Sequence, residues 1–253
     1  MKAFWRSVLI FLISLIVLGL FLAAHLWFSL PDVRELNQRN PEITALMQYR
    51  MRQAELQGLP FHLRYQWVEI RRMPRLLQRS VILAEDASFW VHRGFDWHEV
   101  RAAFRKNLQT GRVVRGGSTI TQQLAKNLYL SPERSIYRKL REMAITYQME
   151  RHLSKRRILE LYLNIIELGP GVFGVQAASQ YYFGVSVANL TPVQILLLAA
   201  TIPSPLKHNP NRPTRQLHWR ANMILKRLKF YGDISDSTFV QLQGELKAYL
   251  GHR

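Results

Sequence analysis

Apolar and polar residues divide the chain into two unequal parts. The first is a continuous apolar stretch, Val8–Phe28, which carries no formal charge and is interrupted only by Ser14, Gly19 and His25. As an α-helix it rises about 1.5 Å per residue, enough to cross the roughly 30 Å hydrocarbon core of a bilayer. A cleaved signal peptide is the alternative, but its apolar region has only about 7–15 residues, and no A-x-A cleavage site follows here. Residues 1–30 are therefore expected to be an uncleaved transmembrane anchor.

From residue 31 onward, apolar residues recur mostly with the spacing of an α-helix, between prolines, glycines and residues that cap helices. Helices are predicted from Asn40 to Gly58, from Pro74 toward Phe89, from Asp96 to Gly111, from Thr119, from Ser131 to about His152, from Ser154, from Thr191 to near Pro203, and on either side of Gly232–Asp233. Alternation over Phe61–Trp67 predicts one short strand or extended segment. Gly111–Gly117 is a predicted loop and Gly169–Gly171 a predicted turn. The pattern indicates a mainly α fold, with residues 31–253 as one domain behind the anchor.

The charges at the start of the chain predict its orientation. Lys2 and Arg6 precede the apolar stretch, and basic residues in this position favour a cytoplasmic N-terminus. The basic residues beyond Leu30 favour the reverse, but a large folded domain translocates largely whatever its charge. We therefore expect a single-pass protein of the cell inner (cytoplasmic) membrane, with its domain in the periplasm.

Composition narrows the classes of function. The chain has 253 residues, of which 48% are hydrophobic, so it can bury a substantial core. It has no cysteine, which excludes disulfides, zinc–thiolate sites, iron–sulfur clusters and cysteine nucleophiles. Thirty-five Lys and Arg against 17 Asp and Glu give a net charge of +18, which predicts an anionic partner. The cations concentrate between Arg101 and Arg157, and beside a membrane anchor this favours a phosphate or lipid-headgroup site over an evenly solvated basic face.

Candidate chemistry begins with Glu85 and Asp86, two carboxylates placed late in a predicted apolar helix. The helix dipole disfavours negative charge there, so the pair needs a cation, a hydrogen bond or a function. Further along, Gly117 followed by hydroxyl residues at a helix start offers free backbone N–H groups that suit an anion. Thr119 and Gln122 also have the spacing of a capping box.

A second group of charges follows at helical spacing. Arg134, Arg138 and Glu142 are four residues apart, which places them on one face of a helix. An exposed ladder of ion pairs is the plain alternative for this triplet. Small residues in Gly171–Phe183 indicate close helix packing in a core.

Each of these features is weak alone, but their order resembles the peptidoglycan glycosyltransferases, the family that polymerises lipid II into glycan strands. The blocks are E-D-x-x-F-x-x-H-x-G at Glu85–Gly94, G-G-S-T-I-T-Q-Q-L-x-K-N at Gly116–Asn127, R-K-x-x-E at Arg138–Glu142, K-x-x-I-L-E-x-Y-L-N at Lys155–Asn164, and a glycine-rich block at Gly171–Phe183. The resemblance runs from about Tyr65 to Pro210, whereas residues 31–60 and 211–253 carry no signature. Ser204–Lys207 matches S-x-x-K, but no S-D-N or K-T-G follows, so a transpeptidase domain is not expected. The chain resembles the monofunctional, membrane-anchored type.

The resemblance implies a lysozyme-like helical glycosyltransferase domain and an inverting transfer that forms β-1,4-linked strands. The 4-hydroxyl of an incoming lipid II would attack C1 of the growing chain and release polyprenyl pyrophosphate. Glu85 is the implied base that takes the hydroxyl proton. Pyrophosphate leaves without a proton, so Glu142, the second candidate catalytic carboxylate, is expected to orient cations or to help bind substrate. The candidate substrate-binding residues are Ser118, Thr119, Gln122, Gln123, Lys126, Asn127, Arg134, Arg138 and Lys139.

The stretch between the first two blocks is a mobile jaw over the cleft in that family. Its apolar side chains could dip into the bilayer; they are Trp97, Val100, Phe104, Val113 and Val114. The expected partners are lipid II, the growing glycan–polyprenyl pyrophosphate and the lipid bilayer, with cell-division or cell-wall synthesis proteins as further candidates. No cofactor is expected to be required, since no D-x-D or H-x-x-x-H pair supports a dedicated metal site, although a divalent cation could stimulate at the pyrophosphate.

Three other functions stay open at this point. A lysozyme-like hydrolase fits the helical body and a glutamate, but it leaves the cation cluster and the anchor unexplained. A non-enzymatic membrane scaffold that binds peptidoglycan precursors would tolerate the loss of Glu85. A nucleic-acid binder requires a cytoplasmic basic face, which the predicted topology opposes, so no nucleic-acid partner is expected.

Overall fold

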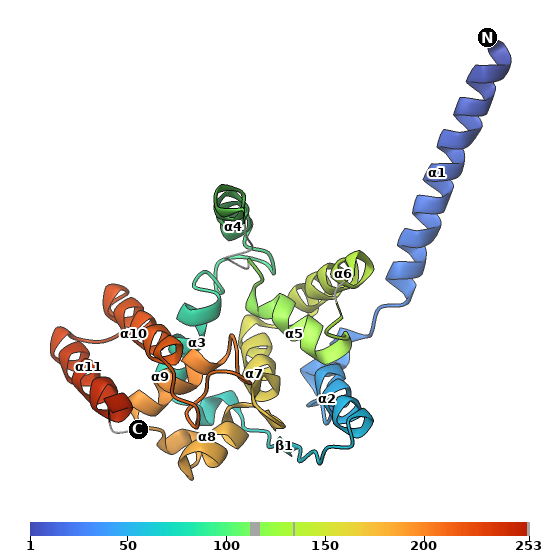
Figure 1. The fold of residues 1–253 in the computed structure, drawn as a ribbon. Helices are drawn as coiled ribbons and strands as arrows, with labels where there is room; N and C mark the ends of the chain where they lie inside the picture. Colours follow the sequence, from blue (N-terminus) through green and yellow to red (C-terminus); the bar gives the residue numbers. More distant parts are fainter. Residues whose placement is uncertain (112–116, 134, 252–253) are drawn as a thin grey trace.

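The computed structural model describes residues 1–111, 117–133 and 135–251. Its first helix, α1 (Lys2–Phe28), extends away from a body of packed helices (Figure 1). The segment Phe4–Phe21 has a mean hydropathy of 2.3, is long and apolar enough to cross a membrane, and is not buried against the body. Because water solvates such a surface poorly, the helix is suited to lipid and supports a membrane anchor.

The body is mainly α-helical, as the sequence predicts. Its elements in chain order are η1 (Val33–Asn37), α2 (Ala45–Leu56), β1 (Arg64–Tyr65), η2 (Ile70–Arg72), α3 (Arg75–Glu85), α4 (Trp97–Thr110), α5 (Ile120–Tyr129), α6 (Ile136–His152), α7 (Lys155–Ile165), β2 (Glu167–Gly169), β3 (Val172–Phe173), α8 (Val175–Phe183), η3 (Val187–Asn189), α9 (Pro192–Thr201), α10 (Arg215–Phe230) and α11 (Asp236–Gly251). The short strands form one sheet in the order β1-β3-β2, in which β3 runs parallel to β1 and antiparallel to β2. The predicted strand over Phe61–Trp67 is therefore shorter than expected, and the predicted turn at Gly169–Gly171 joins β2 to β3.

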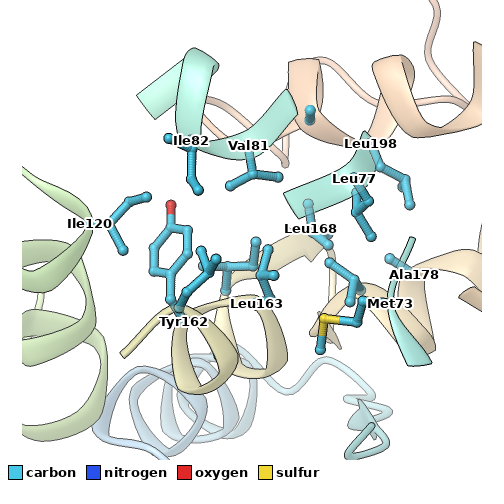
Figure 2. Close-up of a cluster of buried hydrophobic side chains, with 14 of the residues drawn as sticks. Met73, Leu77, Val81, Ile82, Ile120, Tyr162, Leu163, Leu168, Ala178 and Leu198 are labelled. Carbon is cyan, nitrogen blue, oxygen red and sulfur yellow. The ribbon is translucent and has the colours of Figure 1, made fainter. Parts of the chain in front are cut away.

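The core is centred on α7. Its buried apolar residues are Ile158, Leu159, Leu161, Tyr162, Leu163 and Ile165. Charged residues such as Arg156 and Glu160 keep part of the helix surface polar, whereas its apolar residues must be covered. Helix α5 packs closely along α7, while α3, α9 and α10 pack on one another. Figure 2 shows Val81 and Ile82 of α3, Leu198 of α9 and Leu163 of α7 in one apolar cluster. Each such side chain contributes about 1.5–3 kcal/mol when fully buried, so the core fixes the ends of α3 and α5 relative to α7.

Several predicted helix starts are confirmed by capping side chains. Four of these residues accept a hydrogen bond from the backbone N–H three positions later: Asp96, Thr119, Ser154 and Thr191. Thr119 and Gln122 form the predicted capping box, with both of its hydrogen bonds present. These signals are local in sequence, so they could be predicted without knowledge of the tertiary structure.

Three predicted helix limits are wrong. We expected α2 to begin at Asn40–Pro41, but it begins at Ala45 behind Thr44, whose hydroxyl accepts from the backbone N–H of Met47. Likewise, α6 begins behind Ser135 rather than at Ser131–Pro132. In both cases a hydroxyl a few residues later satisfies a free backbone N–H, which proline cannot do. The third limit concerns α3, which ends at Glu85 rather than near Phe89.

Helix α4 has an apolar side that the body does not cover. Trp97, Phe104 and Leu108 are 61–66% exposed. In Figure 1, α4 stands apart from the body on the side from which α1 extends. This placement agrees with a side that faces the bilayer. Val113 and Val114 of the predicted jaw, with most of the predicted loop Gly111–Gly117, lie outside the described residues.

Two glycines with a positive φ, Gly174 at 81° and Gly184 at 69°, provide a test of the packing between α7 and α8. A Cβ on Gly174 would lie 2.2 Å from the backbone oxygen of Asn164, whereas a Cβ on Gly184 would meet nothing within 4 Å. Gly184→Ala should therefore cost only the backbone strain, about 1–2 kcal/mol. Gly174→Ala should cost clearly more, because the chain must also move. Thermal melts of the full chain in detergent measure both, and equal melting temperatures would contradict the close approach.

Candidate active site

Glu85 is the last residue of α3 and is partly buried. The side-chain amide of Gln123 donates a 2.8 Å hydrogen bond to Glu85 Oε2. Burial raises the pKa of the Glu85 carboxyl, and the hydrogen bond from Gln123 and the positive charges of Arg220 and Lys126 act in the opposite direction. A poorly hydrated carboxylate with its own hydrogen-bond donor is an arrangement suited to a general base.

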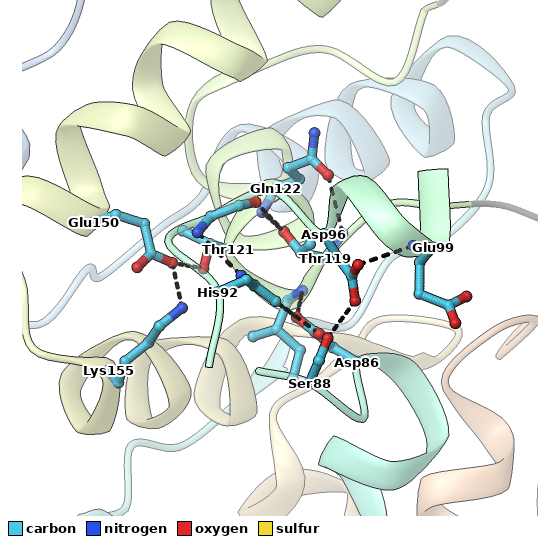
Figure 3. A network of polar contacts seen from close by, with 12 residues as sticks. Asp86, Ser88, His92, Asp96, Glu99, Thr119, Thr121, Gln122, Glu150 and Lys155 are labelled. Carbon is cyan, nitrogen blue, oxygen red and sulfur yellow. Dashed lines mark hydrogen bonds and ion pairs between the residues drawn. The ribbon is translucent and has the colours of Figure 1, made fainter. Parts of the chain in front are cut away.

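The neighbouring carboxylate, Asp86, has a structural role instead. His92 Nδ1 accepts from the backbone N–H of Gly94, so the proton of the neutral imidazole lies on Nε2 and points to Asp86 at 2.8 Å. The other Asp86 oxygen accepts from the backbone N–H of Ile120 at 3.0 Å. Asp86 thereby joins the end of α3, the turn that follows it and the start of α5 (Figure 3). This explains why a buried carboxylate is tolerated here, and why α3 ends where it does.

Thr119 and Gln122, both predicted to bind substrate, are built into the same junction. The Thr119 hydroxyl donates to the backbone oxygen of Gly94 at 2.7 Å and accepts from the backbone N–H of Gln122. The amide oxygen of Gln122 accepts from the backbone N–H of Thr119 at 3.0 Å. The only proton of the Thr119 hydroxyl is therefore used within the fold, so the geometry favours a structural role for Thr119. Gln122 keeps an amide N–H₂ group that can reach the adjacent cavity.

The predicted cations gather between α5 and the start of α6. Glu142 is 3% exposed and accepts hydrogen bonds from Arg138 Nη1 at 2.8 Å and from Lys139 Nζ. Burial lowers the pKa of the Lys126 ammonium; the charge of Glu142 opposes this, and the charge of Arg138 adds to it. Arg138 Nε is buried without a hydrogen-bond partner among the described residues. One carboxylate thus holds two cations beside a third, and the cluster keeps an excess of positive charge.

Two cavities share a lining residue, and Glu85 lines the second of them. The first has a volume of about 440 Å³ and is lined by Ser118, Gln122, Gln123, Lys126, Asn127, Arg138, Lys139 and Glu142, with Arg50 and Glu167 further along. The second has a volume of about 820 Å³, and its lining includes Glu85, Asp86, Ser118, Arg227 and Phe230. Ser118 lines both, and Gln123 in the first binds Glu85 in the second. A molecule in the cationic cavity would therefore end close to the carboxylate.

The structure brings together most of the predicted site residues. Around the two cavities lie Glu85, Ser118, Gln122, Gln123, Lys126, Asn127, Arg138, Lys139 and Glu142. Arg134 and Gly116 lie outside the described residues, so their predicted roles stay predictions. Arg138 and Glu142 lie on one face of α6, as predicted, and form an ion pair between residues four positions apart.

Residues of the block Lys155–Asn164 line neither cavity, and they contact the elements that carry the site. Lys155 pairs with Glu150 at 2.7 Å and lies over the ring of the buried Phe89. The Glu150 carboxylate also accepts from the Thr121 hydroxyl (Figure 3). Asn164 binds both backbone polar groups of Val68. These contacts give the block a role in packing α5, α6 and α7 together.

Sequence reasoning missed Arg220 and Arg227, which lie in the flank that carries no signature. Arg220 contributes positive charge at Glu85, and its Nη1 is buried without a partner among the described residues. Arg227 donates to the backbone oxygen of Leu83 near the C-terminal end of α3. Their spacing of seven places both on one face of α10. The sequence did indicate that two carboxylates at the end of a helix need cations nearby. It did not indicate which residues would supply these cations, because Arg220 and Arg227 lie far away along the chain.

The family of the chain follows from a comparison with known proteins. A model of the transglycosylase family matches residues 52–229, which include Glu85, Lys126, Arg138 and Glu142. The chain belongs to the transglycosylase family. It is a glycosyltransferase, and residues from the first three sequence blocks that resembled this family line the two cavities.

Three curated relatives share one name, and each matches this chain over nearly its full length. The biosynthetic peptidoglycan transglycosylase of Methylobacillus flagellatus is 41% identical over 230 residues, which cover 90% of this chain and 97% of the relative. The protein of the same name from Dechloromonas aromatica is 42% identical over 90% of this chain and 97% of its own length. The one from Nitrosospira multiformis is 40% identical over 89% and 95%.

The structural role of Asp86 in this transglycosylase can be tested by Asp86→Asn. The amide can still accept from the backbone N–H of Ile120, but its own N–H₂ group would face the Nε2–H of His92. We expect the free energy of unfolding to fall by about 1–3 kcal/mol, since a buried donor loses its acceptor. Asp233→Asn is the control, because Asp233 pairs with Arg79 in a more exposed position and should cost about 1 kcal/mol or less. Wild-type melting of Asp86→Asn, together with lost activity, would assign Asp86 a chemical role instead.

Proposed function

We propose that this protein is a peptidoglycan glycosyltransferase, which polymerises lipid II into β-1,4-linked glycan strands with release of polyprenyl pyrophosphate. The observation that carries the proposal is a cationic cavity that adjoins a carboxylate held as a base, in a chain with a membrane anchor. The names of the curated relatives support the same reaction. The substrate that this reaction implies is an anionic lipid that carries sugars. The cations of the cavity match its negative charge, the anchor α1 matches its lipid part, and Glu85 is placed to act on a sugar hydroxyl.

The growing chain would occupy the cationic cavity as the donor. Its pyrophosphate gains negative charge as the bond to C1 breaks, so fixed positive charge lowers the barrier most when it lies at those oxygens. Lys126, Arg138 and Lys139 line this cavity, so their positive charges lie along its wall. Glu142 holds Arg138 and Lys139 in place, which agrees with an orienting role.

The incoming lipid II would occupy the cavity of Glu85 as the acceptor. Its 4-hydroxyl loses the proton to the Glu85 carboxylate while the oxygen forms a bond to C1 of the donor. The bond from C1 to the phosphate oxygen breaks, and the pyrophosphate leaves with the electron pair. Because the base and the cations lie in adjoining cavities, attack and departure can occur on opposite faces of C1, which inverts its configuration. No second carboxylic acid is needed, since pyrophosphate leaves unprotonated.

The exposed apolar surfaces of α1 and α4 support a location at a membrane. We propose that α1 anchors the protein in the cell inner membrane with the body in the periplasm, and that the exposed side of α4 touches the same bilayer. The cations of the site supply the charge that the leaving group needs, so we propose no required cofactor, with a divalent cation as a stimulant. Cell-division or cell-wall synthesis proteins remain candidate partners.

The direct test is incubation of the full-length protein, purified in detergent, with lipid II. We expect glycan polymer and polyprenyl pyrophosphate to form together, and intact sacculi to stay uncleaved. Cleavage of sacculi without polymerisation would indicate the hydrolase. Tight binding of lipid II without any turnover would indicate the scaffold.

The role of Glu85 as base is tested by Glu85→Gln, which keeps the shape and can still accept from Gln123. We expect the initial rate of polymerisation to fall by about 10²–10⁴-fold, the usual contribution of a general base. The melting temperature and the affinity for lipid substrate should change little. Wild-type turnover by this variant would remove Glu85 from the mechanism.

The pyrophosphate clamp is tested at Arg138 and Lys126. An arginine fork can hold two phosphate oxygens whereas lysine offers one charge, so Arg138→Lys should keep part of the activity and Arg138→Ala little. Lys126→Ala should behave like Arg138→Ala, since both serve the same anion. Arg215 is exposed and outside both cavities, so Arg215→Ala is the matched control and should be silent. If the rates follow the melting temperatures instead, the residues only stabilise the fold.

A further inference from the structure

Tyr162 is a fully buried titratable residue for which the proposed mechanism has no use. It lies on α7 with no exposed surface, between Ile82 and Ile120 (Figure 2). A buried hydroxyl without a partner is costly, and this one donates to the side-chain oxygen of Gln123 at 3.0 Å. Gln123 is the residue whose amide N–H₂ group donates to Glu85. Tyr162, Gln123 and Glu85 thus form one chain of hydrogen bonds from the core to the active site.

The direction of this chain follows from its two ends. The Glu85 carboxylate can only accept, so it takes the N–H₂ end of the Gln123 amide. Burial raises the pKa of Tyr162 well above its usual value, and the charges of Glu85 and Asp86 act in the same direction, so the hydroxyl keeps its proton. That proton is donated to the oxygen of the Gln123 amide, which holds the amide from the other side.

We propose that Tyr162 is a positioning residue for the active site, whose hydroxyl holds the Gln123 amide with its N–H directed at the Glu85 carboxylate. The proposal rests on the role of Glu85 as the base. Without the hydroxyl, the oxygen of the Gln123 amide loses its donor in the core, and the amide is no longer held in this orientation. Its hydrogen bond to the Glu85 carboxylate is then weaker, so protonated Glu85 is less disfavoured.

The other charged groups around Glu85 do not replace this contact. Lys126 on α5 and Arg220 on α10 act through their charges, and Asp86 next in the chain adds a like charge. The Gln123 amide is the group on α5 that bonds directly to the carboxylate. Loss of its orientation should therefore raise the pKa of Glu85. Because the unprotonated carboxylate is the active form, activity should then begin at a higher pH.

The test is the pH dependence of kcat/KM for lipid II polymerisation by full-length Tyr162→Phe in detergent. We expect the acid limb to move up by about one pH unit, which is a tenfold loss of rate on that limb, with recovery at higher pH. Tyr182→Phe is the matched control, because the Tyr182 hydroxyl donates to the backbone oxygen of Leu168, away from Glu85. Its acid limb should stay in place. A loss that is uniform across pH in Tyr162→Phe, or an unchanged profile, would overturn the proposal.

Two further variants keep the outcome clear. If Tyr162→Phe does not fold, Gln123→Leu removes the amide itself and should move the acid limb in the same direction by at least as much; a wild-type profile would then overturn the proposal. Glu85→Gln distinguishes a failure of the proposed base from a failure of the proposed role of Tyr162. Turnover by Glu85→Gln would contradict the base, whereas an inactive Glu85→Gln beside an unshifted Tyr162→Phe would contradict only the role of Tyr162.

Discussion

Two adjacent carboxylates end α3, and the rest of the site depends on how differently the fold treats them. The end of a helix is an unfavourable place for negative charge. Asp86 is held by hydrogen bonds from neighbours in the fold, namely the His92 imidazole and the first backbone N–H of α5. Glu85 instead receives a hydrogen bond from a side chain and charge from a distance, and it keeps its place at a cavity. Asp86 thus holds together the junction that places Glu85 at the cavity.

Helix α5 transmits this arrangement to the remainder of the site. Its first residue is bound to Asp86, its next turn carries Gln123 to Glu85, and one turn further Lys126 reaches the cation cluster. A helix is rigid over so short a distance, so the hydrogen-bond partner of Glu85 and the cation cluster are held at a fixed separation. The core around α7 supports the far side of α5, and the hydroxyl of Tyr162 extends that support to Gln123.

The parts of this structure that could be predicted are those with local signals. The capping box at Thr119, the cap at Asp96 and the long apolar helix all depend on residues a few positions apart. Where two local signals compete, as Pro41 does with Thr44, the prediction was wrong, because the helix begins behind the hydroxyl that can cap a free backbone N–H. Ordered motifs placed Glu85, Lys126 and Arg138 at one site, although spacing alone left an ion-pair ladder open. The part played by Arg220 was not predictable, because it arises only when α10 packs against α3.

A structure of the full-length protein with lipid II and a non-transferable donor, in which a methylene replaces the oxygen between C1 and the pyrophosphate, tests the central claim most directly. The account predicts the pyrophosphate against Lys126 and Arg138, with the acceptor 4-hydroxyl about 2.6–3.2 Å from a Glu85 oxygen. A pyrophosphate in the Glu85 cavity, or a 4-hydroxyl that faces Glu142, would contradict it.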